Sequence, residues 1–210
     1  MAMLSAEHYV HADDTMEVCA VSHRIQRAAA TDLEAAAATL AAAFDAYPWT
    51  RWSIPQAGYT ERLEQLQRLY LQFAHEHGIV LIADGARGAL ALLPHDAPEP
   101  PPDFQQRVAD LHGDRLEVLG QADIPAQPGG AWNLATLGVA PDHQGQGLGG
   151  ALVDAGLAAV SAVDAAAGTA LETSDERNVR LYERSGFTVT ATTSIPDGPV
   201  VYSMFRPPAH

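Results

Sequence analysis

The fold of this 210-residue chain is decided by one stretch, Leu137-Gly-Val-Ala-Pro-Asp-His-Gln-Gly-Gln-Gly-Leu-Gly-Gly150. It ends an apolar run typical of a strand, Trp132 to Val139, and opens a helical pattern that continues from Leu148 to Ala167. Four glycines within six residues let backbone N–H groups crowd around an anion without a side chain in the way. The following helix adds free N–H groups and the positive end of its dipole. The stretch therefore predicts a strand–loop–helix unit that binds a pyrophosphate.

Two kinds of pyrophosphate ligand fit these glycines. Gly145-x-Gly147-x-x-Gly150 spells the dinucleotide fingerprint, and Glu172 lies about 20 residues downstream, where a ribose-binding acid would fall. In dinucleotide sites, however, the glycines follow the strand almost directly, whereas residues 140–144 intervene here. The unit also lies late in the chain, with too little sequence after it for a doubly wound sheet. We therefore rank a nicotinamide cofactor below coenzyme A.

The other periodic segments predict an α/β fold with a mixed, mostly antiparallel sheet flanked by helices. Thr31-Asp-Leu-Glu34 matches a capping box ahead of an alanine-rich helix, and Tyr47 to Trp52 should break that helix near Phe44. We read the first 22 residues as a flexible N-terminal tail and residues 23–210 as one domain. The predicted helices after the first are 59–77, 103–119, 148–167 and 176–185, and the predicted strands are 22–27, 79–83, 89–93, 132–139, 169–173, 187–193 and 200–205.

Composition excludes several classes of partner. The formal net charge is −14, with 12 Lys and Arg against 26 Asp and Glu, which argues against nucleic acid and against an anionic membrane surface. The same balance suits a cationic substrate, although solubility alone also explains it. The single cysteine, Cys19, excludes an internal disulfide. Because the first 22 residues lack a basic start and an apolar block, we expect a cytoplasmic protein.

Two motifs in order resemble those of the GNAT superfamily of N-acetyltransferases. The first is Gln144-x-x-Gly147-x-Gly149, which matches the family signature (Gln/Arg)-x-x-Gly-x-(Gly/Ala). The second consists of Leu171-Glu-Thr-Ser174 at a strand end, Asn178, Leu181-Tyr-Glu183 and Gly186-Phe187. The resemblance implies the GNAT fold, acetyl-CoA as cofactor, and direct transfer of the acetyl group to a primary amine.

Within the superfamily the chain looks most similar to the puromycin N-acetyltransferases, from about Arg27 to Arg206. The stretch between Leu93 and Trp132 departs most from that group, and such variable segments usually shape the acceptor pocket. The stretches that carry the likeness are Thr39-Leu-Ala-Ala-Ala-Phe44, Leu134-Ala-Thr-x-Gly-Val139, Pro141-Asp-His-Gln-Gly145, Leu171-Glu-Thr-Ser174 and Tyr182-Glu-Arg-x-Gly-Phe-Thr-Val-Thr190.

This resemblance implies a small-molecule acceptor, with puromycin or a related aminonucleoside as the first candidate, and a monomer or homodimer. The alternatives are acetylation of a protein amine and a non-catalytic domain that senses acyl-CoA.

The resemblance also assigns residues to the cofactor. Asn178 would reach the pantetheine arm or position its helix. The pantetheine arm would lie along the backbone of Leu137, Gly138 and Val139, where an N–H group would stabilise the oxygen that becomes negative during transfer. The pyrophosphate would lie on Gln144, Gly145, Gln146, Gly147, Leu148, Gly149 and Gly150.

Two residues are candidates for the proton transfers. Tyr182 follows Asn178 by four residues, so both share one face of a helix, and its phenol is the predicted general acid toward the leaving thiolate; packing of a half-buried ring is its alternative role. Glu172, on the preceding strand, is the predicted general base, acting directly or through a water. Its alternative roles are electrostatic stabilisation of the site or pairing with Arg177 or Arg180.

Aromatic residues on the other side of the predicted site are candidates for the acceptor. Tyr47, Trp49 and Trp52 could line a pocket for an aromatic amine, although aromatic packing is the more frequent reason for such residues. Asn133 cannot act as a base but could orient a water. We predict no metal site, because His75 and His77 are two apart on a helix and point to different faces.

Overall fold

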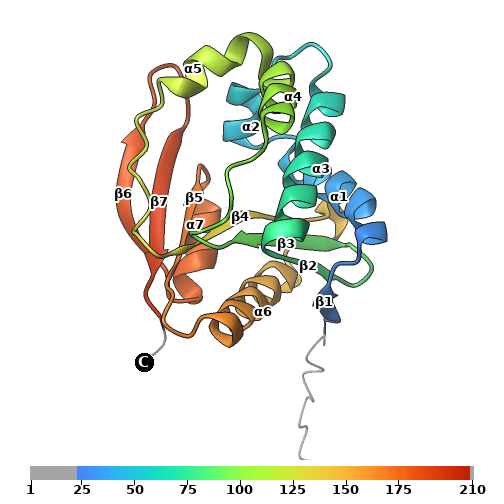
Figure 1. Ribbon diagram of the computed structural model, residues 1–210, viewed down its shortest axis with the longest axis vertical. Coiled ribbons are helices and arrows are strands. Elements are labelled where there is room, and N and C mark those ends of the chain that lie inside the picture. Colours follow the sequence, from blue (N-terminus) through green and yellow to red (C-terminus); the bar gives the residue numbers. More distant parts are fainter. Residues whose placement is uncertain (1–22, 209–210) are drawn as a thin grey trace, which may run out of the picture.

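The computed structural model describes residues 23–208, and the predicted tail, residues 1–22, lies outside them. The described residues form a seven-stranded sheet with the order β1-β2-β3-β4-β5-β7-β6 (Figure 1). Its one parallel pair joins β4 to β5, and its other pairs are antiparallel. The strands are β1 (Ile25–Arg27), β2 (Ile79–Ala83), β3 (Gly88–Leu93), β4 (Trp132–Val139), β5 (Thr169–Thr173), β6 (Thr188–Ser194) and β7 (Val200–Arg206).

Helices cover both faces of this sheet (Figure 1). On one face lie α6 (Leu148–Val163) and α7 (Glu176–Arg184). On the other lie α1 (Leu33–Phe44) and α3 (Tyr59–His77), with α4 (Pro102–His112) packed on α3. The remaining helical segments are α2 (Pro48–Ser53) and α5 (Leu116–Gly120) and three 3₁₀ turns, η1 (Ala30–Asp32), η2 (Gly113–Arg115) and η3 (Pro141–His143).

Successive side chains of a strand point to opposite faces of the sheet, so each face has its own hydrophobic core. In β2, Ile79 and Leu81 belong to the core under α6, whereas Val80 and Ile82 belong to the core under α1 and α3. All five residues of β2 are buried, because helices lie over both faces. The sequence therefore shows a continuous apolar run rather than alternation at this strand.

The sheet is forked between β4 and β5. These strands pair only through Trp132 with Thr169 and Asn133 with Ala170, whereas the pairing of β4 with β3 continues to Val139. Within the described sheet, the edge of β4 beyond Asn133 therefore faces an opening rather than a strand. Strands β5, β7 and β6 turn away from β2, β3 and β4 (Figure 1).

A β-bulge in β4 changes which side chains face the core. Its register with β3 shifts between Ala91, which pairs with Thr136, and Leu92, which pairs with Leu134. The extra residue reverses the alternation of faces, so that Leu134 and Leu137 both pack against the α6 core despite odd spacing. The bulge lies at the fork, immediately after the last β4–β5 pair.

The mixed sheet and its flanking helices confirm the predicted fold class. The stretch expected to break the first helix instead contains α2, which Pro48 opens at the first helical position. Its Thr50 hydroxyl donates to the carbonyl oxygens of Phe44 and Tyr47. The predicted helix 103–119 is divided into α4, η2 and α5, because Gly113 ends α4 with a φ of 53°.

The predicted capping box at Thr31–Glu34 is wrong. The acid that caps this turn is Asp32, whose carboxylate accepts the Ala29 N–H at 2.8 Å. Among residues 23–208 no helix combines the length and the apolar character needed to cross a membrane.

Candidate active site

The glycine-rich loop leaves open space where an anion would lie. Gly145 and Gly147 have φ values of 75° and 84°, which favour glycine. A Cβ built at either glycine would meet no heavy atom of the described residues within 4 Å. The backbone hydrogen bonds of α6 begin with the Ala151 N–H donating to Gly147 O at 3.0 Å. The N–H groups of residues 148–150 therefore have no helical acceptors and can bind an anion.

The amides of the two loop glutamines fasten the loop to itself and to β4. Gln144 Nε2 donates to Val139 O at 3.0 Å, and Gln146 Nε2 donates to Asp142 O at 3.3 Å. The backbone N–H groups of the loop, rather than these side-chain amides, are thus the groups left for a phosphate.

The free edge of β4 can accept an extended ligand as an added strand. Leu137 and Val139 direct their side chains into the α6 core. Because the Ala140 N–H donates to Arg87 O on the β3 side, the alternation along the strand turns the backbone groups of Leu137 and Val139 toward the fork. Gly138 faces the opposite way, where a Cβ would lie 2.7 Å from Leu40 Cδ2 and 3.0 Å from Ala43 Cβ. The absence of a side chain at Gly138 therefore has a packing reason, since it lets α1 lie directly on the strand.

Tyr182 lies in α7, which packs on β5, and is 6% exposed. Its ring packs edge-on against Phe187, with centroids 5.7 Å apart. Burial raises the pKa of Tyr182 above its ordinary value, and the nearby Tyr47 raises it further. The phenol is therefore neutral at ordinary pH.

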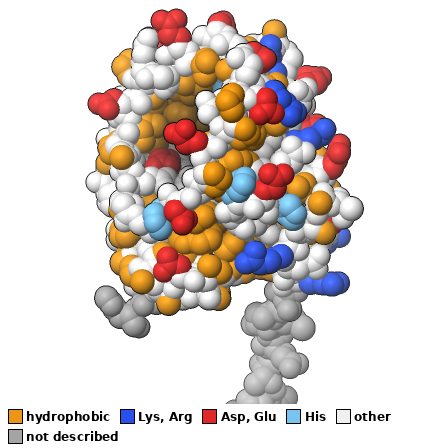
Figure 2. Space-filling view, in the orientation of Figure 1, with side chains coloured by type: hydrophobic (Ala, Val, Ile, Leu, Met, Phe, Trp, Pro, Cys, Tyr) orange, Lys and Arg blue, Asp and Glu red, His pale blue; other side chains and the backbone are white. Residues whose placement is uncertain are grey.

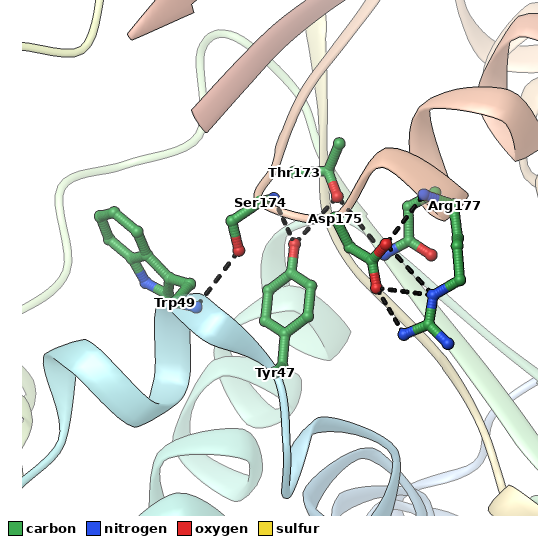
Figure 3. A network of polar contacts seen from close by, with 7 residues as sticks. Tyr47, Trp49, Thr173, Ser174, Asp175 and Arg177 are labelled. Carbon is green, nitrogen blue, oxygen red and sulfur yellow. Dashed lines mark hydrogen bonds and ion pairs between the residues drawn. The ribbon is translucent and has the colours of Figure 1, made fainter. Parts of the chain in front are cut away.

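A hydrogen-bond network ties the α1–α2 connection to the end of β5 (Figure 3). The hydroxyl of Tyr47 accepts the Ser174 N–H at 2.7 Å and shares a hydrogen bond with Thr173 Oγ1 at 2.9 Å. The Trp49 N–H donates to Ser174 Oγ at 3.2 Å, and Asn178 Nδ2 donates to Thr173 Oγ1 at 3.3 Å. The network brings the predicted residues Tyr47, Trp49 and Asn178 together at one strand end.

Asp175 precedes α7 as its N-cap and binds Arg177, one of the two arginines considered above as partners of Glu172. It accepts the Arg177 N–H at 2.8 Å and pairs with the Arg177 guanidinium at 2.7 Å (Figure 3). The alternative in which Glu172 pairs with Arg177 is therefore wrong.

Glu172 instead binds a glutamine that sequence analysis missed. Gln127 Nε2 donates to both carboxylate oxygens of Glu172, at 3.0 and 2.9 Å, and to Asn133 Oδ1 at 3.1 Å. Gln127 comes from the loop before β4, which carries no motif, so no local signal could have identified it. Asn133 is the last β4 residue paired with β5, and the three side chains therefore gather at the mouth of the fork.

The side chain of Glu172 is exposed to solvent, but the protein around its carboxylate still removes part of its hydration. Desolvation raises the pKa of Glu172, and the hydrogen bond from Gln127 lowers it in part. A carboxylate with a raised pKa is a better proton acceptor than an ordinary surface glutamate.

Two of the predicted aromatic residues, Trp49 and Trp52, pack against each other, and Trp52 also packs on the β6–β7 turn. The rings of Trp49 and Trp52 lie 5.3 Å apart, and Trp52 packs so closely on the β6–β7 turn that a Cβ on Gly198 would lie 2.9 Å from its ring. Figure 2 shows a hollow on this face, between the β6–β7 hairpin and the helices, lined mainly by hydrophobic side chains with acidic ones near it. Its lining suits an apolar or aromatic molecule that carries a positive charge.

Comparisons with known proteins agree with this geometry. Residues 108–189 match the family model described as acetyltransferase (GNAT) domain. Mycothiol acetyltransferase of Propionibacterium freudenreichii is 37% identical over 94 residues, which are 42% of this chain. The chain spans only 26% of that relative's length.

Solved structures show the same fold. A protein from Corynebacterium glutamicum described as a histone acetyltransferase and related acetyltransferase has a TM-score of 0.70 at 24% identity, covering 90% of this chain and 98% of that one. Arylalkylamine N-acetyltransferase 2 of Aedes aegypti has a TM-score of 0.64 at 10% identity, covering 88% and 98%. The NatC complex bound to Gag peptide and CoA has a TM-score of 0.51 at 13% identity, covering 89% and 99%.

Proposed function

We propose that this chain, of which residues 108–189 match the model of the GNAT acetyltransferase domain, is an acetyl-CoA-dependent N-acetyltransferase that acts on the primary amine of a small molecule. One observation carries the proposal. Beyond its two pairs with β5, the edge of β4 leads into the glycine-rich loop that begins α6, while Gln127 links Glu172 to Asn133 at the mouth of the fork and Tyr182 comes from α7, which packs on β5. A binding site for a long phosphorylated cofactor thus meets a candidate acid and a candidate base.

The residues around the fork fit coenzyme A. Its pyrophosphate would lie on the N–H groups of the loop from Gly145 to Gly150, where the open space at Gly145 and Gly147 leaves room for it. Its pantetheine arm would lie along the edge of β4 from Leu137 to Val139 as an added strand, pairing with groups other than the Val139 carbonyl, which accepts from Gln144. Asn178 would support this arm from α7.

Acetyl-CoA supplies an acetyl group activated as a thioester, and the chain's residues would handle the protons. Tyr182 would donate the proton of its hydroxyl to the sulfur as the thiolate leaves. A tyrosine phenol is protonated at neutral pH, which is the form that an acid must have, and the raised pKa of Tyr182 makes it a weaker acid than an ordinary tyrosine.

Glu172 would accept the proton that the acceptor amine must lose before it attacks. An ammonium group entering the hollow would be attracted by the carboxylate, and Asn133 could orient a water between them. Gln127 holds the carboxylate by hydrogen bonds to both oxygens, which limits its rotation.

The acceptor that we propose first is puromycin or a related aminonucleoside. Three features support this choice: the likeness to puromycin N-acetyltransferases, the aromatic pair of Trp49 and Trp52, and the excess of acidic residues. A flat aromatic group would stack on these rings while its amine approaches Glu172.

The test measures release of free coenzyme A thiol from acetyl-CoA with puromycin as acceptor and with no acceptor as the blank. We expect release that depends on puromycin. Release only with other amines would retain the reaction and reject the aminonucleoside, and release with peptide amines alone would favour a protein acceptor.

Substitution of Tyr182 separates an enzyme from a sensor domain. Tyr182→Phe should bind acetyl-CoA normally and lower the transfer rate by about 100-fold or more, the usual range for loss of a general acid. Tyr70→Phe, on the exposed surface of α3, is the matched control. A wild type that binds acetyl-CoA but transfers its acetyl group to no amine would refute the enzymatic proposal.

A further inference from the structure

A histidine outside the predicted site contacts the phosphate loop. His23 precedes β1, and its ring lies between the β2–β3 turn and the loop. Nδ1 is 3.0 Å from Asp84 Oδ2, and Nε2 is 3.2 Å from the carbonyl oxygen of Gln146. The His23 side chain is only 10% exposed, so these contacts replace most of its contact with water.

The partners of His23 determine its charge state. An ionised carboxylate and a peptide carbonyl are both acceptors only, whereas a neutral imidazole has a single N–H donor. Both hydrogen bonds can therefore form only when His23 is an imidazolium that donates from both nitrogens. The tautomers of the neutral ring can each satisfy one of the two contacts.

Asp84 is held in place to receive one of these bonds. Its other carboxylate oxygen accepts the Arg24 N–H at 2.8 Å, and its own φ is 49°, a conformation that belongs to the tight β2–β3 turn. Arg87, from the same turn, is the other charged group that acts on Asp84. From the phosphate loop, the group that faces His23 is the neutral carbonyl of Gln146.

Gln146 lies between the two glycines that open the cradle. In a trans peptide the C=O and the following N–H point in opposite directions within one plane. A bond from His23 to the Gln146 carbonyl therefore also fixes the direction of the Gly147 N–H. Because Gly147 is conformationally permissive, its φ would otherwise let this peptide rotate easily.

We propose that His23 is a positioning residue for the phosphate loop: its imidazolium clamps the Gln146 peptide, and this makes the affinity for coenzyme A depend on pH. The inference rests on the proposed function, because it assumes that the loop binds the coenzyme's pyrophosphate. The positively charged ring also lies against the loop that would receive the anion. Its attraction for the pyrophosphate and its hold on the Gln146 peptide therefore both strengthen binding of the coenzyme.

The direction of the pH effect follows from the contacts. The hydrogen bond to Asp84, and then the bond to the Gln146 carbonyl, raise the pKa of His23 above its ordinary value. The clamp is thus complete below that pKa and is lost as the pH rises through it. Affinity for coenzyme A should be higher on the acid side of this transition.

The experiment measures the dissociation constant of coenzyme A by calorimetry at pH 6 and pH 8.5 for wild type, His23→Gln and His95→Gln. His95 is an exposed histidine in the loop after β3 and serves as the control. Pantetheine, which has no phosphate, is the second probe. Comparison of variant and wild type at each pH cancels the titration of the coenzyme's own phosphate.

We expect His23→Gln to weaken coenzyme A binding about fivefold at pH 6, the size of one lost charge-assisted contact, and to have little effect at pH 8.5. Pantetheine binding and the His95→Gln variant should match wild type. The ¹⁵N shifts of His23 in the wild type should show both ring nitrogens protonated at pH 6.

Equal affinities of wild type and His23→Gln at pH 6 would overturn the clamp, and so would an equal loss of pantetheine binding, which would indicate general damage to the fold. A wild type that binds no coenzyme A at either pH would refute the proposed function itself, and the clamp with it.

Discussion

The hydrogen bonds of Gln127 predict how the pH dependence of transfer changes when they are removed. Gln127→Leu keeps the size of the side chain but deletes the donor to both oxygens of Glu172 and to Asn133. Desolvation, the largest influence on this carboxyl, raises the pKa of Glu172, and Gln127 opposes it. Without Gln127 the pKa of Glu172 must therefore rise further.

The size of the rise follows from the nature of the bond. A hydrogen bond to a charged group contributes about 1.5–3 kcal/mol when it is shielded from water. The side chain of Glu172 is exposed, so we discount this to roughly 1 kcal/mol. Since about 1.4 kcal/mol corresponds to a factor of ten, the proton affinity of Glu172 should rise about fivefold.

A base must be deprotonated to act, so the acid limb of the kcat/KM profile should move to higher pH by the same amount. On that limb kcat/KM should fall about fivefold, and on the plateau it should change little. The assay is thiol release across pH 4.5 to 8, with ¹³C NMR of the Glu172 carboxyl as a second measurement that needs no acceptor.

Gln121→Leu, an exposed position in the same loop, is the control and should leave the profile unchanged. An acid limb that stays in place in a folded Gln127→Leu protein, or that moves to lower pH, would refute the assignment of Glu172 as a base held by Gln127.

Three further substitutions test the fold around the site. Gly78→Ala would place a Cβ 2.1 Å from a backbone oxygen of β3, and urea denaturation should show that the free energy of unfolding falls by about 3 kcal/mol. Gly120→Ala, where a Cβ would enter open space, should change the free energy of unfolding little. Burial lowers the pKa of His112, whose Nδ1–H donates to the Ser53 carbonyl at 2.7 Å. As the pH falls through 6.5, the unfolded chain binds a proton at this residue more readily than the folded chain does, so the free energy of unfolding decreases. His112→Gln should therefore reduce the dependence of the free energy of unfolding on pH between pH 7.5 and 5.5. Tyr47→Phe removes the acceptor of the backbone N–H at the end of β5 and should lower the free energy of unfolding by about 1–2 kcal/mol; an unchanged urea midpoint would show that this network does not stabilise the fold.

Local patterns in the sequence were sufficient for most of the fold. The helix Tyr59–His77 and the strands Ile79–Ala83 and Trp132–Val139 have the predicted bounds, because each combines a clear apolar period with a strong stop signal such as Gly78. Helix α2 was missed because Pro48 was read as a breaker, although proline also opens helices.

The contacts of the site depended on tertiary structure and could not be predicted in the same way. Glu172 and Asn133 were each singled out, but Gln127, which joins them, comes from a loop whose path is set by the rest of the molecule. His23 contacts Gln146 across 123 positions of sequence, and no local pattern records such a contact. The bulge in β4 was also absent from the sequence analysis, because its apolar residues fit an uninterrupted strand equally well.

The fork in the sheet also divides its strands into two blocks. Strands β1 to β4 come from residues 25–139 and β5 to β7 from residues 169–206, and only two residue pairs join these blocks within the sheet. A ligand that fills the fork would link the two blocks by backbone hydrogen bonds, at a place where the described sheet has few of its own. Its binding should therefore slow hydrogen exchange at the amides on both sides of the seam and raise the melting temperature with ligand concentration.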